Sequence, residues 1–218
     1  LVQLNGMVTR QVKNRKAWMM KNIVQKYGVQ LIGLGEVGIN LKKAKVKRLL
    51  SLLPDLGLHA RCSTAHNTHE NFAVHQQGGV ATIVLGKLLN YYKKGTKDFR
   101  NLGRWDSFFL RSIDGHRTRV GQGYAVQAAR SKRVGSVDQQ HVRYIQRNDL
   151  GSITPQELFE QDLIWQLQVW RALGDRISMM MDANCHVLTG RLSRALTHES
   201  IGLREINKDH IGSNCPNT

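Results

Sequence analysis

The strongest constraint on the fold is a pair of short apolar runs that each lead to a carboxylate. Residues 29–34 are mostly apolar, and Glu36 follows them after one glycine. Residues 177–181 form a second such run, which leads directly into Asp182 and then Asn184. Short apolar runs bounded by turn residues are typical of strands buried on both faces. Both runs are therefore predicted to be interior strands that carry polar side chains to the edge of a sheet.

Helical patterns alternate with these strands. Residues 10–27 have a rough helical period that ends before Gly28. Thr154, Pro155 and Glu157 have the spacing of a capping box at the start of a second helix. Further strands are predicted at 1–4, 58–62, 80–85, 105–113 and 118–126, further helices at 41–53, 137–146 and 188–197, and a polar loop at 63–75. The alternation predicts a layered α/β domain, and with no internal repeat or linker we expect a single domain over residues 1–218.

The charge of the chain points to a polyanionic partner. Lys and Arg number 32 against 16 Asp and Glu, which gives a formal net charge of +16. A positive field of this size favours nucleic acid, although a basic surface can also serve only solubility. No run of about 18 apolar residues is present, so we expect no membrane partner. Three widely spaced cysteines fit neither a disulfide framework nor a zinc site, which favours a reducing, intracellular setting.

Four polar residues are candidates for a shared site. Glu36, Asp182 and Asn184 follow the two interior strands, and Asn5 follows the first predicted strand. Polar groups at the ends of buried strands converge on one rim of a sheet, where carboxylates bind Mg²⁺ or Mn²⁺. Such an ion neutralises phosphate charge and activates water. The alternative for each residue alone is that it simply begins the turn after its strand.

The order of these motifs resembles the endonuclease/exonuclease/phosphatase superfamily, which includes apurinic-site endonucleases and the endonuclease domains of LINE-type retroelements. The resemblance is carried by Leu4-Asn5-Gly6, residues 31–37, Tyr124, and Met181-Asp182-Ala183-Asn184. The retroelement-like features are Gly78-Gly79-Val80, Gly103-Arg104-Trp105 and Gln139-Gln140.

The resemblance implies a two-sheet α/β sandwich with flanking helices (DNase I-like) and an active site at one rim. It implies that Glu36 binds the metal, with Asn5 near it, and that Asp182 orients or activates the attacking water. It further implies that Asn184 and Tyr124 contact the phosphate. In-line attack on a phosphodiester depends on such positioning and charge stabilisation.

The chain also departs from the family pattern. Gln3 stands where many relatives have an Asn, Gly35 replaces the usual Gln, and Ala125 follows Tyr124 without the nearby Pro. The family ends in an Asp-bearing strand and a Ser-Asp-His strand. His210 follows Asn184 too closely to belong to them. We therefore expect a domain that is incomplete at its C-terminus and lacks these final strands.

Three functions are compatible with these features. The first is a divalent-metal-dependent phosphodiesterase, an endonuclease of the retroelement type that acts on DNA. The second is a catalytically degenerate domain that still binds nucleic acid. The third is a phosphatase of the same superfamily, which the positive charge disfavours. We expect an intracellular location, with the nucleus as the candidate compartment.

Overall fold

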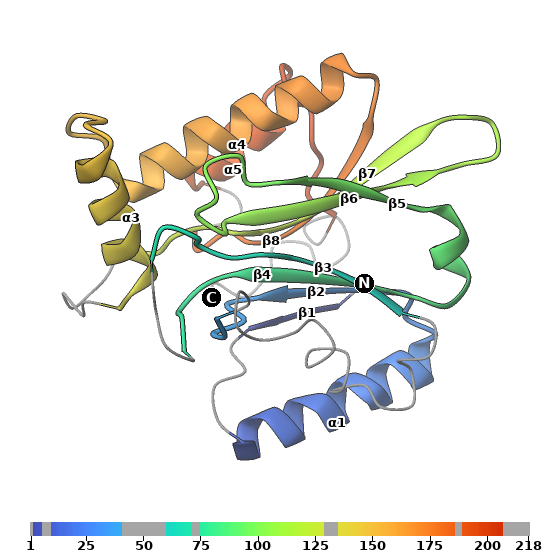
Figure 1. The fold of residues 1–218 in the computed structure, drawn as a ribbon. Coiled ribbons are helices and arrows are strands. Elements are labelled where there is room, and N and C mark those ends of the chain that lie inside the picture. Colours follow the sequence, from blue (N-terminus) through green and yellow to red (C-terminus); the bar gives the residue numbers. More distant parts are fainter. Residues whose placement is uncertain are drawn as a thin grey trace.

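The described residues form two four-stranded β-sheets that pack face to face, with helices on their outer faces (Figure 1). The structure is a computed structural model that describes residues 2–5, 10–40, 60–70, 75–128, 135–185 and 189–206, with side chains described from residue 18 onward. This arrangement confirms the predicted two-sheet α/β sandwich with flanking helices. The predicted helix at 41–53 and His210 lie outside the described residues.

The first sheet has the order β1-β2-β4-β3 and the second the order β5-β6-β7-β8. The strands of the first sheet are β1 (Val2–Asn5), β2 (Leu31–Gly35), β3 (Ala60–Ala65) and β4 (Val80–Leu85). Those of the second are β5 (Tyr92–Lys97), β6 (Trp105–Arg111), β7 (Arg117–Tyr124) and β8 (Arg176–Asp182). The helices are α1 (Arg10–Tyr27), the 3₁₀ helix η2 (Gly86–Tyr91), α3 (Val137–Arg147), α4 (Pro155–Ala172) and α5 (Arg191–Thr197).

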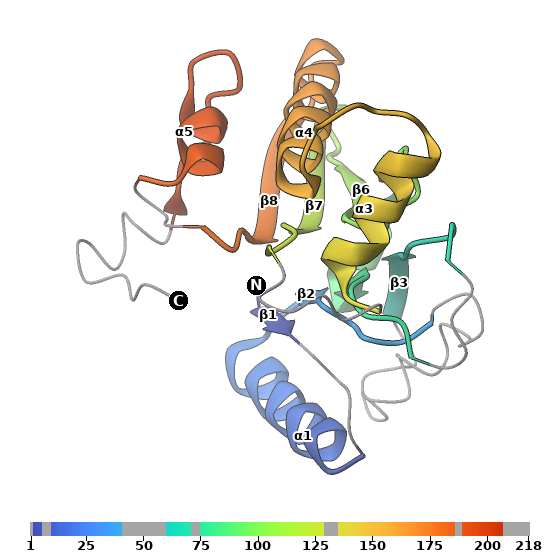
Figure 2. The ribbon, with the colours of Figure 1, turned by 90° about the vertical axis from the view of Figure 1, so that its left-hand side faces the viewer.

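Each sheet is covered by helices on its outer face (Figures 1 and 2). On the first sheet, Met20 and Val24 of α1 pack against Ile32 and Leu34 of β2. The apolar face of α4 packs on the second sheet, in a cluster that contains Leu163, Leu167, Trp170 and Trp105. The core is therefore a stack of four layers, helix on sheet on sheet on helix. None of the described helices has the length and apolar character needed to cross a membrane.

The capping box of α4 is present as predicted. The Thr154 hydroxyl accepts a hydrogen bond from the Glu157 backbone N–H at 3.2 Å, and the Glu157 carboxylate accepts one from the Thr154 N–H at 3.0 Å. These bonds satisfy N–H groups that the first turn of a helix leaves unpaired. The end of α1 at Gly28 is also confirmed, because Gly28 adopts φ +60° there.

A row of polar residues crosses the middle of the sandwich. In the first sheet Ser63 and Thr82 are direct neighbours on β3 and β4, and Gly33 is the next in the row. In the second sheet Asp106 and Gln122 are direct neighbours on β6 and β7. The rows face each other, since the Ser63 hydroxyl donates to Asp106 Oδ1 at 2.8 Å. A Cβ added to Gly33 would lie 1.9 Å from Oε1 of Gln122, so the sheets meet closely here.

Several predicted boundaries were wrong. Residues 63–65 belong to β3 and not to the predicted loop at 63–75. The two strands of the predicted hairpin are shorter than expected and end at Arg111 and Tyr124. The edge strand β5 and the helix η2 were not predicted. Their sequence, Gly86 to Lys97, lacks the alternation of apolar and polar residues that marks a half-buried strand.

Candidate functional site

The two predicted carboxylates reach the same end of the sandwich from different sheets. Glu36 follows β2 in the first sheet, and Asp182 is the last residue of β8 in the second. The expectation of one rim of one sheet is therefore corrected: the two strands end at facing edges of two sheets. Convergence arises from the packing of the layers, since β2 contacts both β7 and β8.

Tyr124 joins the two sides of the site. It is the last residue of β7, is 5% exposed, and lies beside Asp182 in the parallel pairing of β7 with β8. Its hydroxyl crosses to the first sheet and donates a hydrogen bond to Oε1 of Glu36 at 2.5 Å. A hydrogen bond to a charged acceptor is short and strong compared with a neutral one. Tyr124 therefore fixes the Glu36 carboxylate relative to β7 and β8.

The electrostatics of Tyr124 show that Glu36, Asp182 and Asn184 all lie near its phenol. Burial raises the pKa of its phenol, as do the hydrogen bond to Glu36, the charge of Glu36 and the charge of Asp182. A hydrogen bond with the Asn184 side chain opposes this rise in pKa. Burial and nearby negative charge both disfavour a phenolate. Tyr124 therefore remains a neutral donor, and Glu36, Asp182 and Asn184 are gathered around it.

Asn184 is held by hydrogen bonds to its neighbours. Its Nδ2 donates to the carbonyl of Ala125 at 2.7 Å, and the Ala125 N–H donates to the carbonyl of Asp182 at 2.8 Å. The Tyr124 N–H donates to the carbonyl of Arg104 at 2.9 Å. These bonds continue the ladder of the second sheet past the ends of β7 and β8. The side chains of Tyr124 and Asn184 are therefore positioned by backbone that is itself fixed.

Two of the site residues adopt a backbone conformation that L-residues seldom take. Glu36 and Asn184 both have φ +46°. The left-handed region costs about 1–2 kcal/mol for a residue with a Cβ, less for Asn. Strained residues of this kind persist where the surrounding structure fixes them, and they cluster at functional sites.

The turn after Glu36 is supported by a pair of glycines. The Val37 and Gly38 N–H groups donate to the carbonyls of Gly79 and Gly78, each at 3.1 Å. Gly78 and Gly79 have φ +84° and +80°, a region that suits glycine. The sequence shows this glycine pair, but it does not show that the pair supports Glu36.

The position of Asn5 agrees with its predicted place at the site end of the sandwich. Asn5 ends β1 and pairs with Gly35 of β2, the residue before Glu36. Its backbone is therefore next to the site. Its side chain is outside the described part of the structure, so a metal contact by Asn5 stays a prediction.

The donor set fits a hard divalent cation. Glu36 and Asp182 offer carboxylate oxygens, and only one oxygen of Glu36 accepts from Tyr124. Within the described residues, no group of three or more His, Cys, Asp or Glu side chains is placed to hold a metal ion. Mg²⁺ commonly binds through one or two carboxylates together with water and substrate phosphates. Glu36 and Asp182 are thus the residues that would hold such an ion.

The residues that gave the retroelement resemblance have structural roles in this fold. Arg104 is buried and forms ion pairs with Asp98 and Asp162, both at 2.8 Å. Gly103 has φ +77° and lies against the backbone of His66. Gln140 is also buried, and its side chain accepts from Asn67 and donates to two carbonyls. Through these ion pairs and hydrogen bonds, Arg104 and Gln140 connect neighbouring loops.

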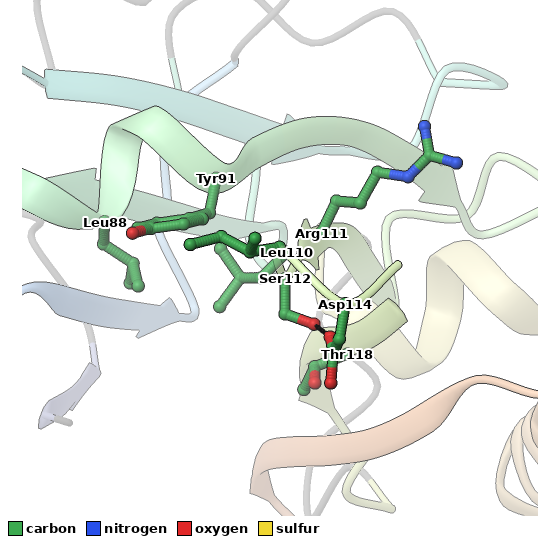
Figure 3. Close-up of a pocket in the computed structure, with 8 residues that line it drawn as sticks. Leu88, Tyr91, Leu110, Arg111, Ser112, Asp114 and Thr118 are labelled. Atoms are coloured by element: carbon green, nitrogen blue, oxygen red, sulfur yellow. Dashed lines mark hydrogen bonds between the residues drawn. The ribbon is translucent and has the colours of Figure 1, made fainter. Parts of the chain in front are cut away.

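A pocket of about 690 Å³ lies at the opposite end of the second sheet (Figure 3). It is formed by η2 and the β6–β7 hairpin, and Leu88, Tyr91 and Leu110 lie together along one side of it. Arg111 and Arg117 pair at this end of β6 and β7, whereas Tyr124 is at the other end of β7. The pocket is therefore separate from the carboxylate site.

The chain matches no protein-family model and no curated protein by sequence. Its structure is similar to that of the human Nocturnin catalytic domain with bound sulfate, with a TM-score of 0.55 and 12% sequence identity over 92% of this chain and 67% of that chain. It is also similar to an endonuclease/exonuclease/phosphatase family protein from Bacteroides thetaiotaomicron, with a TM-score of 0.50 and 10% identity over 89% of this chain and 66% of that one. A mannosyl-6-phosphatase from the same organism gives a TM-score of 0.50 and 11% identity over 89% of this chain and 67% of that one.

These comparisons establish the fold. The two sheets with flanking helices are the DNase I-like sandwich of endonuclease/exonuclease/phosphatase proteins. This chain spans about two thirds of the length of those structures. Because one fold hosts several chemistries, the function of this chain depends on the groups at its site.

Proposed function

We propose that the protein is a divalent-metal-dependent phosphodiesterase that acts on DNA as an endonuclease of the retroelement type. The observation that carries the proposal is the hydrogen bond from Tyr124 to Glu36 across the two sheets, with Asp182 and Asn184 beside it. This arrangement places two carboxylates, a phenol and an amide at one end of the fold. The similarity of the fold to an endonuclease/exonuclease/phosphatase family structure supports a phosphate ester as substrate.

Each residue has a distinct role in the proposed reaction. A divalent cation held by Glu36 and Asp182 would supply charge neutralisation at the phosphate and a lower pKa for water. Tyr124 orients Glu36 through its single O–H donor, and it contacts the phosphate by turning that donor to a phosphate oxygen. Asp182 accepts the proton of the attacking water on the carboxylate oxygen that does not hold the ion. Asn184 contacts a phosphate oxygen after exchanging one of its present hydrogen bonds, since its amide has two N–H donors.

Charge favours DNA over a small substrate. The net charge of +16 would attract a polyanion at long range and hold it by phosphate contacts. The similarity to a mannosyl-6-phosphatase favours a phosphatase as the second candidate function. A small phosphate monoester gains far less from so large a field than a nucleic acid does. We further propose that the protein acts inside the cell, in the nucleus.

The test is nicking of supercoiled plasmid by the purified protein. We expect Mg²⁺-dependent nicking that is abolished by EDTA and reduced about 100-fold or more by Glu36→Gln. The matched control is Asp149→Asn. Asp149 is an exposed carboxylate between α3 and α4, and its φ of +47° suits Asn. This control should retain wild-type activity.

Each alternative has its own outcome in the same assay. Nicking that survives both EDTA and Glu36→Gln would place the chemistry elsewhere and contradict the proposal. DNA binding without nicking would identify the catalytically degenerate domain. Mg²⁺-dependent release of phosphate from a sugar phosphate, with no nicking, would identify a phosphatase.

A further inference from the structure

One side of the sandwich carries a group of exposed basic residues away from the candidate site. The side is formed by β3 and β5, which are edge strands of their sheets and contact each other, together with η2. We refer to its five basic residues as the lysine flank. They are Arg61, Lys87, Lys93, Lys94 and Lys97, and all five are exposed.

The flank gathers exposed basic residues that form no ion pair with a carboxylate among the described residues, whereas residues of this kind elsewhere, such as Lys26 and Arg176, are scattered. Elsewhere arginines form ion pairs, for example Arg117 and Arg119 with Asp175 and Arg143 with Glu70. Among the described residues, none of the five flank cations forms an ion pair with a carboxylate. The buried Asp106 attracts Lys97 electrostatically, but it is 0% exposed. The flank charges therefore face solvent and are available to an external anion.

A β-bulge aligns two of these lysines. Lys94 pairs with Phe108 and Lys97 with Asp106, so β5 contains one extra residue between them. Gly95 permits the bulge, since a Cβ there would lie 2.2 Å from the Ser107 carbonyl oxygen. Phe108 and Asp106 share one face of β6 because they are two residues apart. Directly opposed residues share a face as well, so the bulge puts Lys94 and Lys97 on the same face of the sheet.

This face is the one that looks toward the first sheet. Phe108 packs against Val84 of β4, and Val84 pairs directly with Arg61 of β3. Arg61 therefore belongs to the facing surface of the first sheet. Lys94, Lys97 and Arg61 thus border the open side of the sandwich, while Lys93 belongs to the outer face of β5.

We propose that the lysine flank binds the phosphate backbone of duplex DNA as a contact separate from the candidate active site. Lys93 to Lys97 span about 13 Å along β5, and β5 lies about 14 Å from β8 across the sheet. Each DNA strand carries a phosphate about every 3.4 Å along the helix axis. A duplex that reaches the site thus has several phosphates within range of the flank. The identity of the polyanion rests on the proposed function.

Lysines on an edge strand have a second known use, which is to prevent pairing with a strand of another chain. The two roles predict different results when the charges are removed. Loss of a protective role leads to self-association with DNA affinity unchanged. Loss of a binding role lowers DNA affinity and reduces its dependence on salt.

The experiment measures binding of a fluorescent DNA duplex from about 50 to about 200 mM salt in EDTA, so that no cleavage occurs. In Lys93→Gln/Lys94→Gln/Lys97→Gln we expect the slope of log K against log salt to fall by about 2.7, which is about 0.9 for each lysine. The matched control removes three exposed charges elsewhere, as Lys26→Gln/Arg176→Gln/Arg194→Gln. Its slope should change by less than about 1.

Two further variants keep the inference testable if the triple variant self-associates. Lys93→Arg/Lys94→Arg/Lys97→Arg preserves charge and should preserve the slope. The single Lys97→Gln should lower the slope by about 0.9. The inference is overturned by an unchanged slope in the glutamine variants, by an equal fall in the control, or by wild-type protein that binds DNA without salt dependence. Loss of binding to phosphatidylserine vesicles with DNA binding intact would also overturn it.

Failure of the flank and failure of the proposed function give different results. If the flank variants lose binding but no form of the protein nicks DNA, the flank stands and the proposed catalysis fails. If nicking is observed and the flank variants bind DNA normally, the proposed catalysis stands and the proposal for the flank fails.

Discussion

Asp106 lies between the two sheets and is 0% exposed. Its Oδ1 accepts a hydrogen bond from the Ser63 hydroxyl at 2.8 Å. Burial raises the pKa of this carboxyl to about 6, and the hydrogen bond from Ser63 and the charge of Lys97 oppose the rise. The folded protein therefore binds the Asp106 proton more tightly than the unfolded chain does.

This raised pKa predicts a pH-dependent loss of stability at one residue. Between about pH 4 and pH 6 the folded state keeps a proton that the unfolded state releases, so the contribution of Asp106 to stability falls as pH rises. Above about pH 6 the loss is complete, at about 2–3 kcal/mol. We expect Asp106→Asn to be more stable than wild type at pH 8 by about that amount, as measured by denaturant unfolding.

Comparing the free energy of unfolding of wild type with that of Asp106→Asn across pH isolates the contribution of Asp106. The pKa of His141 is lowered to about 3, mainly by burial, so its contribution acts in the opposite direction and is lost as pH falls below about 6.5. That contribution is common to both proteins and cancels in the difference. A difference in free energy of unfolding that stays constant from pH 4 to pH 8 would show that Asp106 does not titrate as described.

At the same scale, candidate site residues could be named from the sequence, but their contacts could not. Glu36, Asp182 and Asn184 were recognisable because each follows an apolar run, and Tyr124 through the family resemblance. The bond from Tyr124 to Glu36 was not predictable, since it joins residues on different sheets and depends on how those sheets pack. The left-handed backbone of Glu36 leaves no mark in the sequence.

Among the elements, α4 depends on a local hydrogen-bond pattern at its first turn. Thr154→Ala removes the side-chain oxygen that accepts the Glu157 N–H. We expect a loss of about 1 kcal/mol in the free energy of unfolding, because that N–H is left without its partner. Thermal and denaturant unfolding would measure the loss.

Ser152 provides the control for this prediction. It is exposed and lies just before the cap, so Ser152→Ala removes a hydroxyl without removing the cap. Its effect should stay within about 0.5 kcal/mol. Equal losses in the two variants would mean that the capping box does not stabilise α4.

Elements with strong local patterns were predicted well, and edge elements were not. The capping box of α4 and the apolar strands β2, β4 and β8 are encoded in a few adjacent residues. In contrast, β5 has the sequence Tyr-Lys-Lys-Gly-Thr-Lys and takes its strand form from pairing with β6. Tertiary context decides such a segment, and its bulge depends on the position of the Ser107 carbonyl.

For the whole molecule, Gly103 marks a place where segments associated with the two sheets touch. It precedes β6 and lies against the backbone of His66, which follows β3, and a Cβ there would be 2.5 Å from the His66 Cα. Gly103→Ala therefore requires backbone to move and places a Cβ at φ +77°. We expect a loss of about 3 kcal/mol in the free energy of unfolding, measured with denaturant.

Gly115→Ala separates the two causes of this loss. Gly115 has φ +84° in the β6–β7 turn, and no atom lies within 4 Å of an added Cβ. This variant should lose only about 1 kcal/mol from backbone strain. If Gly103→Ala loses no more than Gly115→Ala, the close approach of the two segments does not contribute to stability.

The two-sheet architecture followed from the resemblance and not from local patterns. The apolar strands indicated buried sheets, but they did not say how many sheets or which strands paired. The rows of Ser63 and Thr82 facing Asp106 and Gln122 illustrate the difficulty, since polar residues in strands usually indicate a solvent face. Here they face each other across the interior, and Ser63 donates a hydrogen bond to Asp106.

In the described residues, the chain completes one sheet before it begins the other. All four strands of the first sheet precede η2, and all four of the second follow it. Glu36 thus comes from one half of the polypeptide, and Tyr124 and Asp182 come from the other. A cut at η2 would leave Glu36 in one fragment and Tyr124, Asp182 and Asn184 in the other, and only reassociation of the fragments would bring these groups together again. Recovered activity would then be a direct measure of docking between two separately made pieces.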